Sequence, residues 1–320
     1  MISTTLTERW SLRHPLVNAP MTPAAGARLA RAVSAAGGMG VLGLDWREDR
    51  ASVEREIAAV AGSPAIPFGM GLVTWALDEA PHLLDLAIEA RPRFVCLSFG
   101  DPAPHAGRLI ASGIELVAQV QDRAGAVAAV RAGASVVVAQ GTEAGGHTGR
   151  VGTLTLLQTV LDAVDVPVIA AGGIGSGRGA AAAIAAGAAG VWVGTAFLFA
   201  HEARVTQGAR AKLAAANEGD TVLTHVFDRV QGLRWPEAFP ARALKNRFSE
   251  RYQGREQEID DRARAAFQHA KAAEDYDVAN VYAGEAVGLG AQARPAAEIV
   301  RAISERAEKL LRAVGSHFQA

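Results

Sequence analysis

Residues 140–147 place one carboxylate and one imidazole among three glycines, in the order Gln-Gly-Thr-Glu-Ala-Gly-Gly-His. They follow the apolar run 134–139, which predicts a buried strand. Glycines let a backbone come close to a flat or charged ligand, and His147 at the end of a strand is a candidate proton-transfer group. A glycine-rich turn whose histidine faces solvent is the alternative interpretation, and these eight residues alone leave both open.

Two later segments have the composition of a phosphate site. Residues 170–177 hold four glycines, and Gly194-Thr195 follows another predicted strand. Backbone N–H groups at such glycines can bind an anion, together with the N-terminus of a helix that begins near Ser176. The same glycines could also serve only to permit tight turns between strand and helix. The two segments together predict a bound phosphate group and do not specify the phosphorylated compound.

Three other predicted strand ends carry small, sulfur or amide side chains: Ala19-Pro20-Met21, Gly69-Met70-Gly71 and Gln119-Val120-Gln121. Such residues suit a planar, partly polar ring, although Met21 and Met70 could equally fill the core. The sequence shows no metal-ligand spacing and no Gly-x-Ser-x-Gly motif. All four lysines lie beyond residue 211, so no predicted strand offers one for Schiff-base chemistry.

The elements that would position these residues are indicated by a regular alternation of short apolar runs and longer helical patterns. Strands are predicted at 16–19, 40–44, 66–73, 94–98, 115–120, 135–140, 167–171 and 190–194. Helices are predicted at 24–36, 50–61, 78–90, 103–112, 122–132, 153–163, 177–186 and 196–206. Eight strands that are each followed by a helix predict an α/β fold of the (β/α)8 TIM-barrel class, in which ligands bind at the C-terminal strand ends.

A doubly wound open sheet is the competing fold. It would need about six strands and a glycine fingerprint after the first of them. The sequence holds a Gly-x-Gly-x-x-Gly motif at 38–43, but it runs from a predicted helix end into a strand. That order is the reverse of a dinucleotide-binding turn, so the barrel is favoured.

The composition changes near Asn217, and we predict a (β/α)8 barrel over 1–217 and a helical extension over 218–320 that packs on the barrel. Within the extension, the mixed-charge stretch 242–277 predicts a solvated helix face. Residues 293–315 have the apolar spacing of an amphipathic helix.

The overall composition limits the classes of partner. The chain has 320 residues, of which 50% are hydrophobic, and a net charge of −1, which argues against binding of nucleic acid or of an anionic membrane. No segment approaches the roughly 20 apolar residues of a membrane-spanning helix, and residues 1–10 lack the apolar core of a secretory signal. The single cysteine, Cys96, excludes an intramolecular disulfide. We therefore expect a cytoplasmic protein.

Taken together, these segments resemble the nitronate monooxygenase family, formerly called 2-nitropropane dioxygenases, which are FMN-dependent barrel enzymes. The resemblance covers nearly the whole chain. It rests on Asn18–Met21, Ser98–Gly100, 140–147, 170–179 and Gly194-Thr195, with a C-terminal segment at 282–288.

The resemblance implies FMN as the cofactor and His147 as the base that removes the proton α to a nitro group. The residues that it places around FMN have separate roles. Ala19, Pro20 and Met21 would line the flavin ring, Gln140 and Gly145 would hold the ring and ribityl chain, and Gly172, Gly173, Gly194 and Thr195 would hold the phosphate. Gly71, Gln119 and Gly146 are also placed among the cofactor-binding positions.

Two positions depart from the family pattern. Gly71 stands where many relatives have an asparagine, and Gln119 stands where a small hydroxyl residue is expected. Both positions lie at the predicted substrate entrance, so they bear on the substrate more than on the flavin.

The resulting hypothesis is the oxidation of alkyl nitronates or nitroalkanes with oxygen, giving a carbonyl compound and nitrite. An FMN-dependent, NAD(P)H-linked reductase similar to the enoyl-acyl-carrier-protein reductases of the same scaffold is the first alternative. A non-catalytic flavin-binding protein and a flavin-free barrel isomerase of a phosphorylated metabolite are the others.

Overall fold

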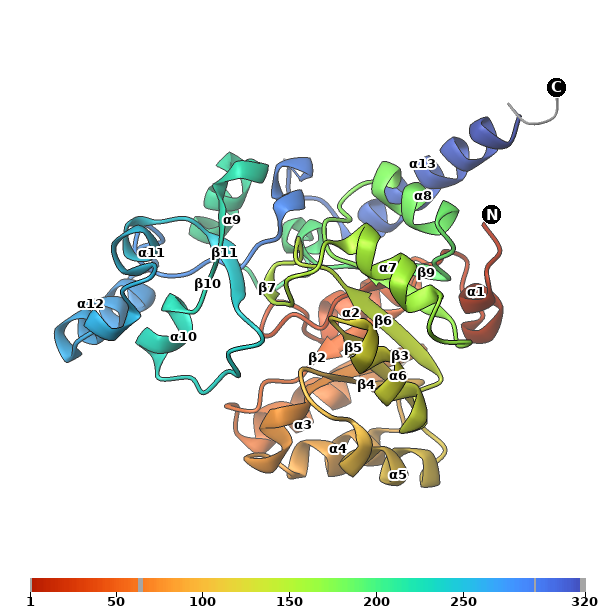
Figure 1. Cartoon of the computed structure of the whole chain (residues 1–320), viewed down its shortest axis with the longest axis horizontal. Coiled ribbons are helices and arrows are strands. Elements are labelled where there is room, and N and C mark those ends of the chain that lie inside the picture. Colours follow the sequence, from red (N-terminus) through yellow and green to blue (C-terminus); the bar gives the residue numbers. More distant parts are fainter. Residues whose placement is uncertain (1, 63–65, 291, 317–320) are drawn as a thin grey trace.

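The computed structural model describes residues 2–62, 66–290 and 292–316. Eight parallel strands form a barrel, and helices lie around it (Figure 1). The strands are hydrogen-bonded in the order β1-β9-β8-β6-β5-β4-β3-β2, and a parallel bridge between Val17 and Met39 joins the first strand to β2. The predicted (β/α)8 TIM barrel is therefore confirmed.

The barrel strands begin and end within two residues of the predicted positions. They are β1 (Leu16–Asn18), β2 (Gly40–Gly43), β3 (Phe68–Val73), β4 (Phe94–Ser98), β5 (Glu115–Val120), β6 (Val136–Gln140), β8 (Val168–Ala171) and β9 (Gly190–Val193). The helices between them are α2 (Ala27–Ala35), α3 (Arg50–Ala61), α4 (His82–Ala90), α5 (Ala103–Ala111), α6 (Arg123–Arg131), α7 (Thr153–Leu161) and α8 (Gly177–Ala185).

One end of the barrel is closed by a helix that the sequence analysis did not predict, α1 (Thr5–Trp10). Its Trp10 ring stacks on Phe94 inside the barrel, with ring centroids 4.6 Å apart, and its indole N–H donates to Glu115. The barrel interior is otherwise filled by apolar strand residues, including the buried Cys96. Gly40 of the 38–43 motif lies against α2, where a Cβ would sit 1.8 Å from the Ala30 carbonyl oxygen, so this motif serves helix packing.

The eighth helix of the ring does not come from the segment after β9. The helix expected at 196–206 is a 3-10 turn over Thr195–Phe199, and α13 (Ala296–Ser316) packs against α8 and α2 instead. Two hydrogen bonds join the segment after β9 to the start of α13. The Arg294 amide donates to the Phe199 carbonyl, and the Ala296 amide donates to the Glu202 carboxylate. The prediction of an amphipathic helix near 293–315 is confirmed, and its position completes the barrel.

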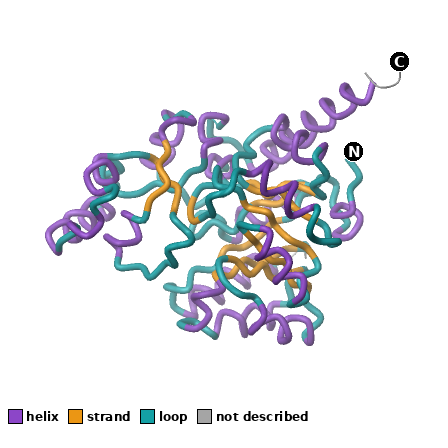
Figure 2. Tube along the Cα trace, in the orientation of Figure 1, coloured by secondary structure: helices purple, strands orange, loops and turns teal. Residues whose placement is uncertain are grey.

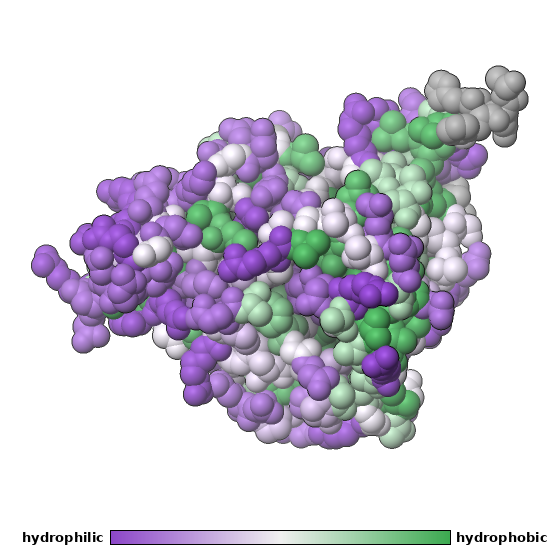
Figure 3. Space-filling model, viewed as in Figure 1, coloured by the Kyte–Doolittle hydropathy of each residue, from purple (hydrophilic) through white to green (hydrophobic). Residues whose placement is uncertain are grey.

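The remainder of the extension lies at the other side of the molecule (Figure 1). It contains α9 (Gln207–Ala215), α10 (Val226–Gln231), α11 (Arg247–Tyr252) and α12 (Asp261–Ala272). Hydrophilic side chains dominate the surface at the α11–α12 end (Figure 3). None of the helices in the described ranges is long and apolar enough to span a membrane.

The extension is not purely helical, which corrects the sequence-based expectation. Strands β10 (Thr221–Thr224) and β11 (Ala241–Leu244) pair antiparallel, and β11 also pairs with β7 (Gly146–His147) in the loop after β6. This small sheet is separate from the barrel strands (Figure 2). It joins the loop that carries His147 directly to the extension.

Candidate active site

The loop after β6 is held in place by contacts from both the barrel and the extension. The Gln140 side chain donates to the His147 carbonyl over 3.1 Å, and the Thr148 amide donates to the Pro240 carbonyl over 3.0 Å. His147 faces Ala241 in the register between β7 and β11. The predicted strand-end position of His147 is correct, and it does not face open solvent: its side chain is 9% exposed.

The His147 imidazole lies between a carboxylate and an indole. Its Nε2 is 3.0 Å from Oδ1 and 3.1 Å from Oδ2 of Asp228, which lies on α10 and is 2% exposed. The Trp235 ring stacks on the imidazole, with centroids 3.3 Å apart and planes within 8°. Burial lowers the pKa of His147 below its ordinary value, and the hydrogen bond to the Asp228 carboxylate only partly offsets this. The lowered pKa favours the neutral imidazole, which is the form that can accept a proton.

Aromatic side chains from distant segments surround Trp235. Trp75, Phe99 and Trp46 lie edge-on to it, with centroid distances of 5.2, 5.2 and 5.9 Å. Phe99 directly follows β4 and has a φ of +62°, a strained conformation for a bulky residue that is typical of functional sites. These rings form an apolar wall beside the candidate base, which we call the aromatic wall.

Three amide side chains gather at the ends of β5 and β6. Gln119 and Gln121 both donate to the Gln140 Oε1, over 3.2 and 2.9 Å. Gln140 also donates one N–H to the His147 carbonyl, so it positions the loop, and its contact with a flavin stays a prediction. Among the described residues, the Gln119 oxygen and its second N–H have no hydrogen-bond partner, so a polar ring edge could bind them.

The loops after β8 and β9 have the features of an anion site. Gly172 and Gly173 adopt φ values of +100° and +67°, and Ser176 caps the N-terminus of α8. The amides of Gly173, Gly175 and Thr195 donate to no residue that the structure describes. Thr195 accepts a bond from the Gly284 amide, so its hydroxyl hydrogen is free to donate.

Several predicted glycines have a structural explanation of their own. A Cβ at Gly145 would lie 2.5 Å from the Gly284 nitrogen, and a Cβ at Gly71 would lie 2.3 Å from the Pro20 Cβ. At Gly145 the extension backbone crosses the loop, and at Gly71 a proline fills the space. Gly146 has a φ of +72° and open surroundings. A direct cofactor contact at these three positions therefore stays a prediction.

A flavin phosphate agrees with this donor set. Free amides, a helix N-terminus and a hydroxyl lie at the ends of β8 and β9, and Gly194 leaves space beside Ala19 and Met21, where a Cβ would be 3.5 Å from each. Glu143 borders the same loop, but its carboxylate is turned toward the N-terminus of α7, where it accepts from the Thr153 amide and hydroxyl. No group of side chains in the described ranges could hold a metal ion.

Arg242 shows where the charge pattern was misinterpreted. It lies in the stretch predicted as a solvated face, but it is 7% exposed. It donates to the Thr142 carbonyl and the Thr221 hydroxyl and pairs with Glu285 at 3.0 Å, which ties the loop after β6 to β10 and to the C-terminal segment. Asp228, Trp235 and Arg242 were all missed, because their role depends on contacts that no local pattern encodes.

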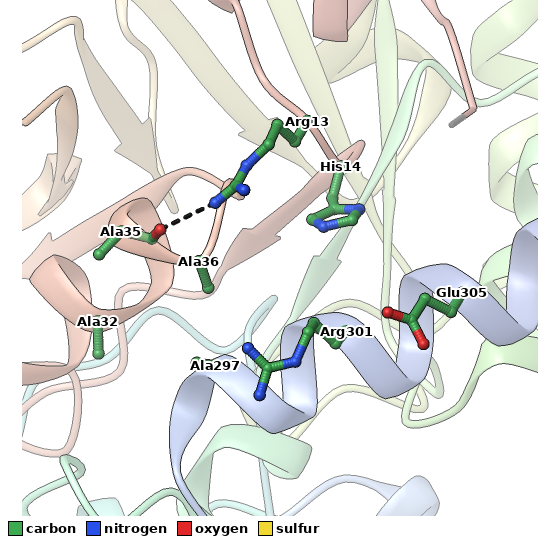
Figure 4. A pocket seen from close by; sticks show the side chains of 8 residues that line it. All are labelled: Arg13, His14, Ala32, Ala35, Ala36, Ala297, Arg301 and Glu305. Carbon is green, nitrogen blue, oxygen red and sulfur yellow. Dashed lines mark hydrogen bonds between the residues drawn. The ribbon is translucent and has the colours of Figure 1, made fainter.

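One cavity lies away from this site. It has a volume of about 510 Å³ and lies at the opposite end of the barrel, between α2 and α13. Figure 4 shows Arg13 bonded to the Ala35 carbonyl, with His14 beside it and Arg301 and Glu305 on α13. A smaller cavity of about 360 Å³ adjoins Trp235 and is lined by Arg229, Arg234 and Arg264.

Comparison with known proteins places the chain in a family. The model of the nitronate monooxygenase family matches residues 80–306. Nitronate monooxygenase npaC of Metarhizium robertsii is 34% identical, with 97% of this chain and 95% of that protein covered. A probable nitronate monooxygenase of Staphylococcus aureus is 30% identical over 80% of this chain and 82% of that protein.

Other similar proteins have different names. A Rhodococcus jostii protein named (3aS,4S,5R,7aS)-5-hydroxy-7a-methyl-1-oxo-octahydro-1H-indene-4-carboxyl-CoA dehydrogenase is 37% identical over 71% of this chain, which spans 64% of that protein's length. FabK from Thermotoga maritima superposes with a TM-score of 0.86 at 29% identity, covering 99% of this chain and 100% of FabK. A nitroalkane oxidase from Streptomyces ansochromogenes gives 0.82 at 27% identity, with 97% and 99% covered. The chain belongs to the nitronate monooxygenase family of oxidoreductases.

Proposed function

We propose that the protein is an FMN-dependent enzyme that oxidises alkyl nitronates or nitroalkanes with oxygen, giving a carbonyl compound and nitrite. The observation that carries this proposal is a buried imidazole in the loop after β6, in a barrel whose loops after β8 and β9 present free amides. Family membership supports a flavin as the cofactor. The single cysteine is consistent with a cytoplasmic location.

Each part of the site has a separate task in this proposal. The amides of Gly173 and Gly175 and the Thr195 hydroxyl would hold the phosphate of FMN, and the segment Ala19–Met21 would face its ring. When bound, the flavin would supply the electron-accepting chemistry. His147 would remove the proton from the carbon that bears the nitro group, which a pre-formed nitronate has already lost. The aromatic wall would exclude water from the reacting carbon.

The test compares a neutral nitroalkane with its pre-formed nitronate. We expect His147→Gln to retain flavin and to lose about 10²–10⁴-fold in kcat/KM on the neutral nitroalkane, with a much smaller loss on the nitronate. His269→Gln, on the exposed face of α12, is the matched control and should change neither. Equal losses on the two substrates would count against His147 as the base. The flavin released from the wild-type protein identifies FMN, and a colourless protein would favour the flavin-free isomerase.

A second candidate is the NAD(P)H-linked reduction of an enoyl thioester. It is favoured by the three arginines that line the cavity beside Trp235, which suit an anionic carrier group, and by the CoA thioester in the name of the Rhodococcus jostii relative. Anaerobic flavin reduction separates the two functions. Rapid reduction by NADH but not by nitronate would replace the first candidate with the second.

A further inference from the structure

We propose that Asp228 is a positioning residue for His147, which it holds in the tautomer that carries the proton on Nε2, so that Nδ1 is the proton-accepting atom. The inference rests on the proposed role of His147 as the base. It assigns a function to the extension, which supplies Asp228 from α10, 81 residues away from His147.

The distances and burial define the direction of the hydrogen bond. Both carboxylate oxygens of Asp228 lie within 3.1 Å of Nε2. An ionised carboxylate only accepts hydrogen bonds, so Nε2 must donate. In the neutral imidazole the lone pair is then on Nδ1, which has no hydrogen-bond partner among the described residues.

The surroundings of Asp228 show that it does not belong to a structural ion pair. Within the described ranges, His147 is its only side-chain partner, and no lysine or arginine pairs with it. A buried carboxylate without a permanent cation costs stability, so a purely structural role is poorly explained. Asp228 instead faces His147, which becomes positive when it takes up a proton. The carboxylate would stabilise that charge, as a general base requires.

Aromatic rings around His147 hinder a 180° rotation of the imidazole. Trp235 covers one face of the ring at 3.3 Å, and Tyr282 and Phe99 lie at centroid distances of 5.9 and 6.3 Å. A half-turn of the imidazole about its bond to Cβ would sweep the ring through the indole. The Trp235 ring that covers His147 therefore also preserves the ring orientation that Asp228 selects.

The other titratable and charged groups that face His147 do not compete with Asp228. Arg47 is bound to the Asp45 carboxylate through two nitrogens, at 2.8 and 2.6 Å. Burial raises the pKa of Tyr282 far above its ordinary value, so this phenol stays neutral. Burial lowers the pKa of His225, which therefore adds little positive charge at pH 7. Asp228 is the one carboxylate in hydrogen-bond contact with the ring among the described residues.

The experiment measures the tautomer and the pH profile of the flavin-loaded enzyme. We expect ¹⁵N NMR of histidine-labelled wild-type protein to show Nε2 protonated and Nδ1 unprotonated at His147. Asp228→Asn removes the charge that stabilises the imidazolium, so the pKa of His147 should fall further. On a neutral nitroalkane, the acidic limb of kcat/KM should move to lower pH, and its plateau should fall about tenfold or more because the base is weaker. Activity on pre-formed nitronate should change little.

Controls separate the possible outcomes. Asp261→Asn removes an exposed charge in the first turn of α12 and should leave the profile unchanged. An unchanged pH profile and plateau in Asp228→Asn would overturn the proposal. An Nδ1-protonated His147 in the wild-type protein would overturn it without any variant, even if Asp228→Asn failed to fold. If His147→Gln instead lowers kcat/KM equally on the neutral nitroalkane and the nitronate, the proposed function fails. The tautomer measurement then still decides the role of Asp228.

Discussion

The barrel loops and the extension contribute different chemistry to the candidate site. The ends of β8 and β9 offer backbone amides and small residues, which can hold a phosphate and a flat ring. The extension offers side chains: a carboxylate, an indole and a buried guanidinium, from Asp228, Trp235 and Arg242. In the proposed function, the backbone donors would bind the cofactor, whereas the side chains would orient the base and shape the substrate space. The difference indicates that cofactor binding and substrate choice can vary independently.

The largest effect on the barrel side is expected for Gly172→Ala. The new Cβ would lie 2.7 Å from the Thr153 Oγ1 and 2.8 Å from the Gly141 carbonyl oxygen, and a φ of +100° strains any side chain by about 1–3 kcal/mol. We expect flavin affinity, measured by fluorescence titration, to fall at least about tenfold. Gly113→Ala has a φ of +72° with open space around it, so it imposes strain far from the flavin loops. Equal flavin loss in both variants would argue against a phosphate site at Gly172.

A smaller effect is expected where the loop after β6 and the extension are joined. Arg242→Met removes the hydrogen bonds to Thr142 and Thr221 and the ion pair with Glu285. We expect the free energy of unfolding, from urea denaturation, to fall by about 2 kcal/mol, since buried acceptors lose their donor. Arg255→Met removes only an exposed pair with Glu258, which solvent screens, and should lower the free energy of unfolding far less. Comparable losses would mean that Arg242 does not couple the extension to the loop.

The smallest expected effect is a shift in the pKa of His147 in variants of Trp235. Trp235→Ala exposes the imidazole to water, so the pKa of His147 should rise toward its ordinary value of 6.5, the opposite of the change expected for Asp228→Asn. Because protonation disables a base, activity on a neutral nitroalkane should then begin to fall at a higher pH as the solution is acidified. Trp235→Phe keeps an apolar cover and should shift the pKa less. A fall in the pKa of His147 in Trp235→Ala, followed by NMR titration, would contradict the assigned role of burial.

The barrel was predictable because its signals are local. Apolar runs and glycine positions specify parallel strands, so all eight strands appear where expected, and β4 (Phe94–Ser98) and β5 (Glu115–Val120) agree at both ends. The eighth helix was predicted wrongly. The segment 196–206 has helical composition but forms only a short 3-10 turn at its start, and α13 occupies the eighth position around the barrel. Strands β10 and β11 were missed, because strands of only four residues carry little periodic signal.

The sequence by itself determined the barrel, the position of His147 in the loop after a strand and the glycine loops after β8 and β9. These follow from residue type and spacing, which act over a few residues. Only the tertiary structure decided what surrounds the imidazole, because Asp228 and Trp235 reach it across 81 and 88 positions of chain. Burial and hydrogen bonding in that enclosure, rather than the histidine itself, decide whether the ring is a neutral base and which nitrogen accepts the proton.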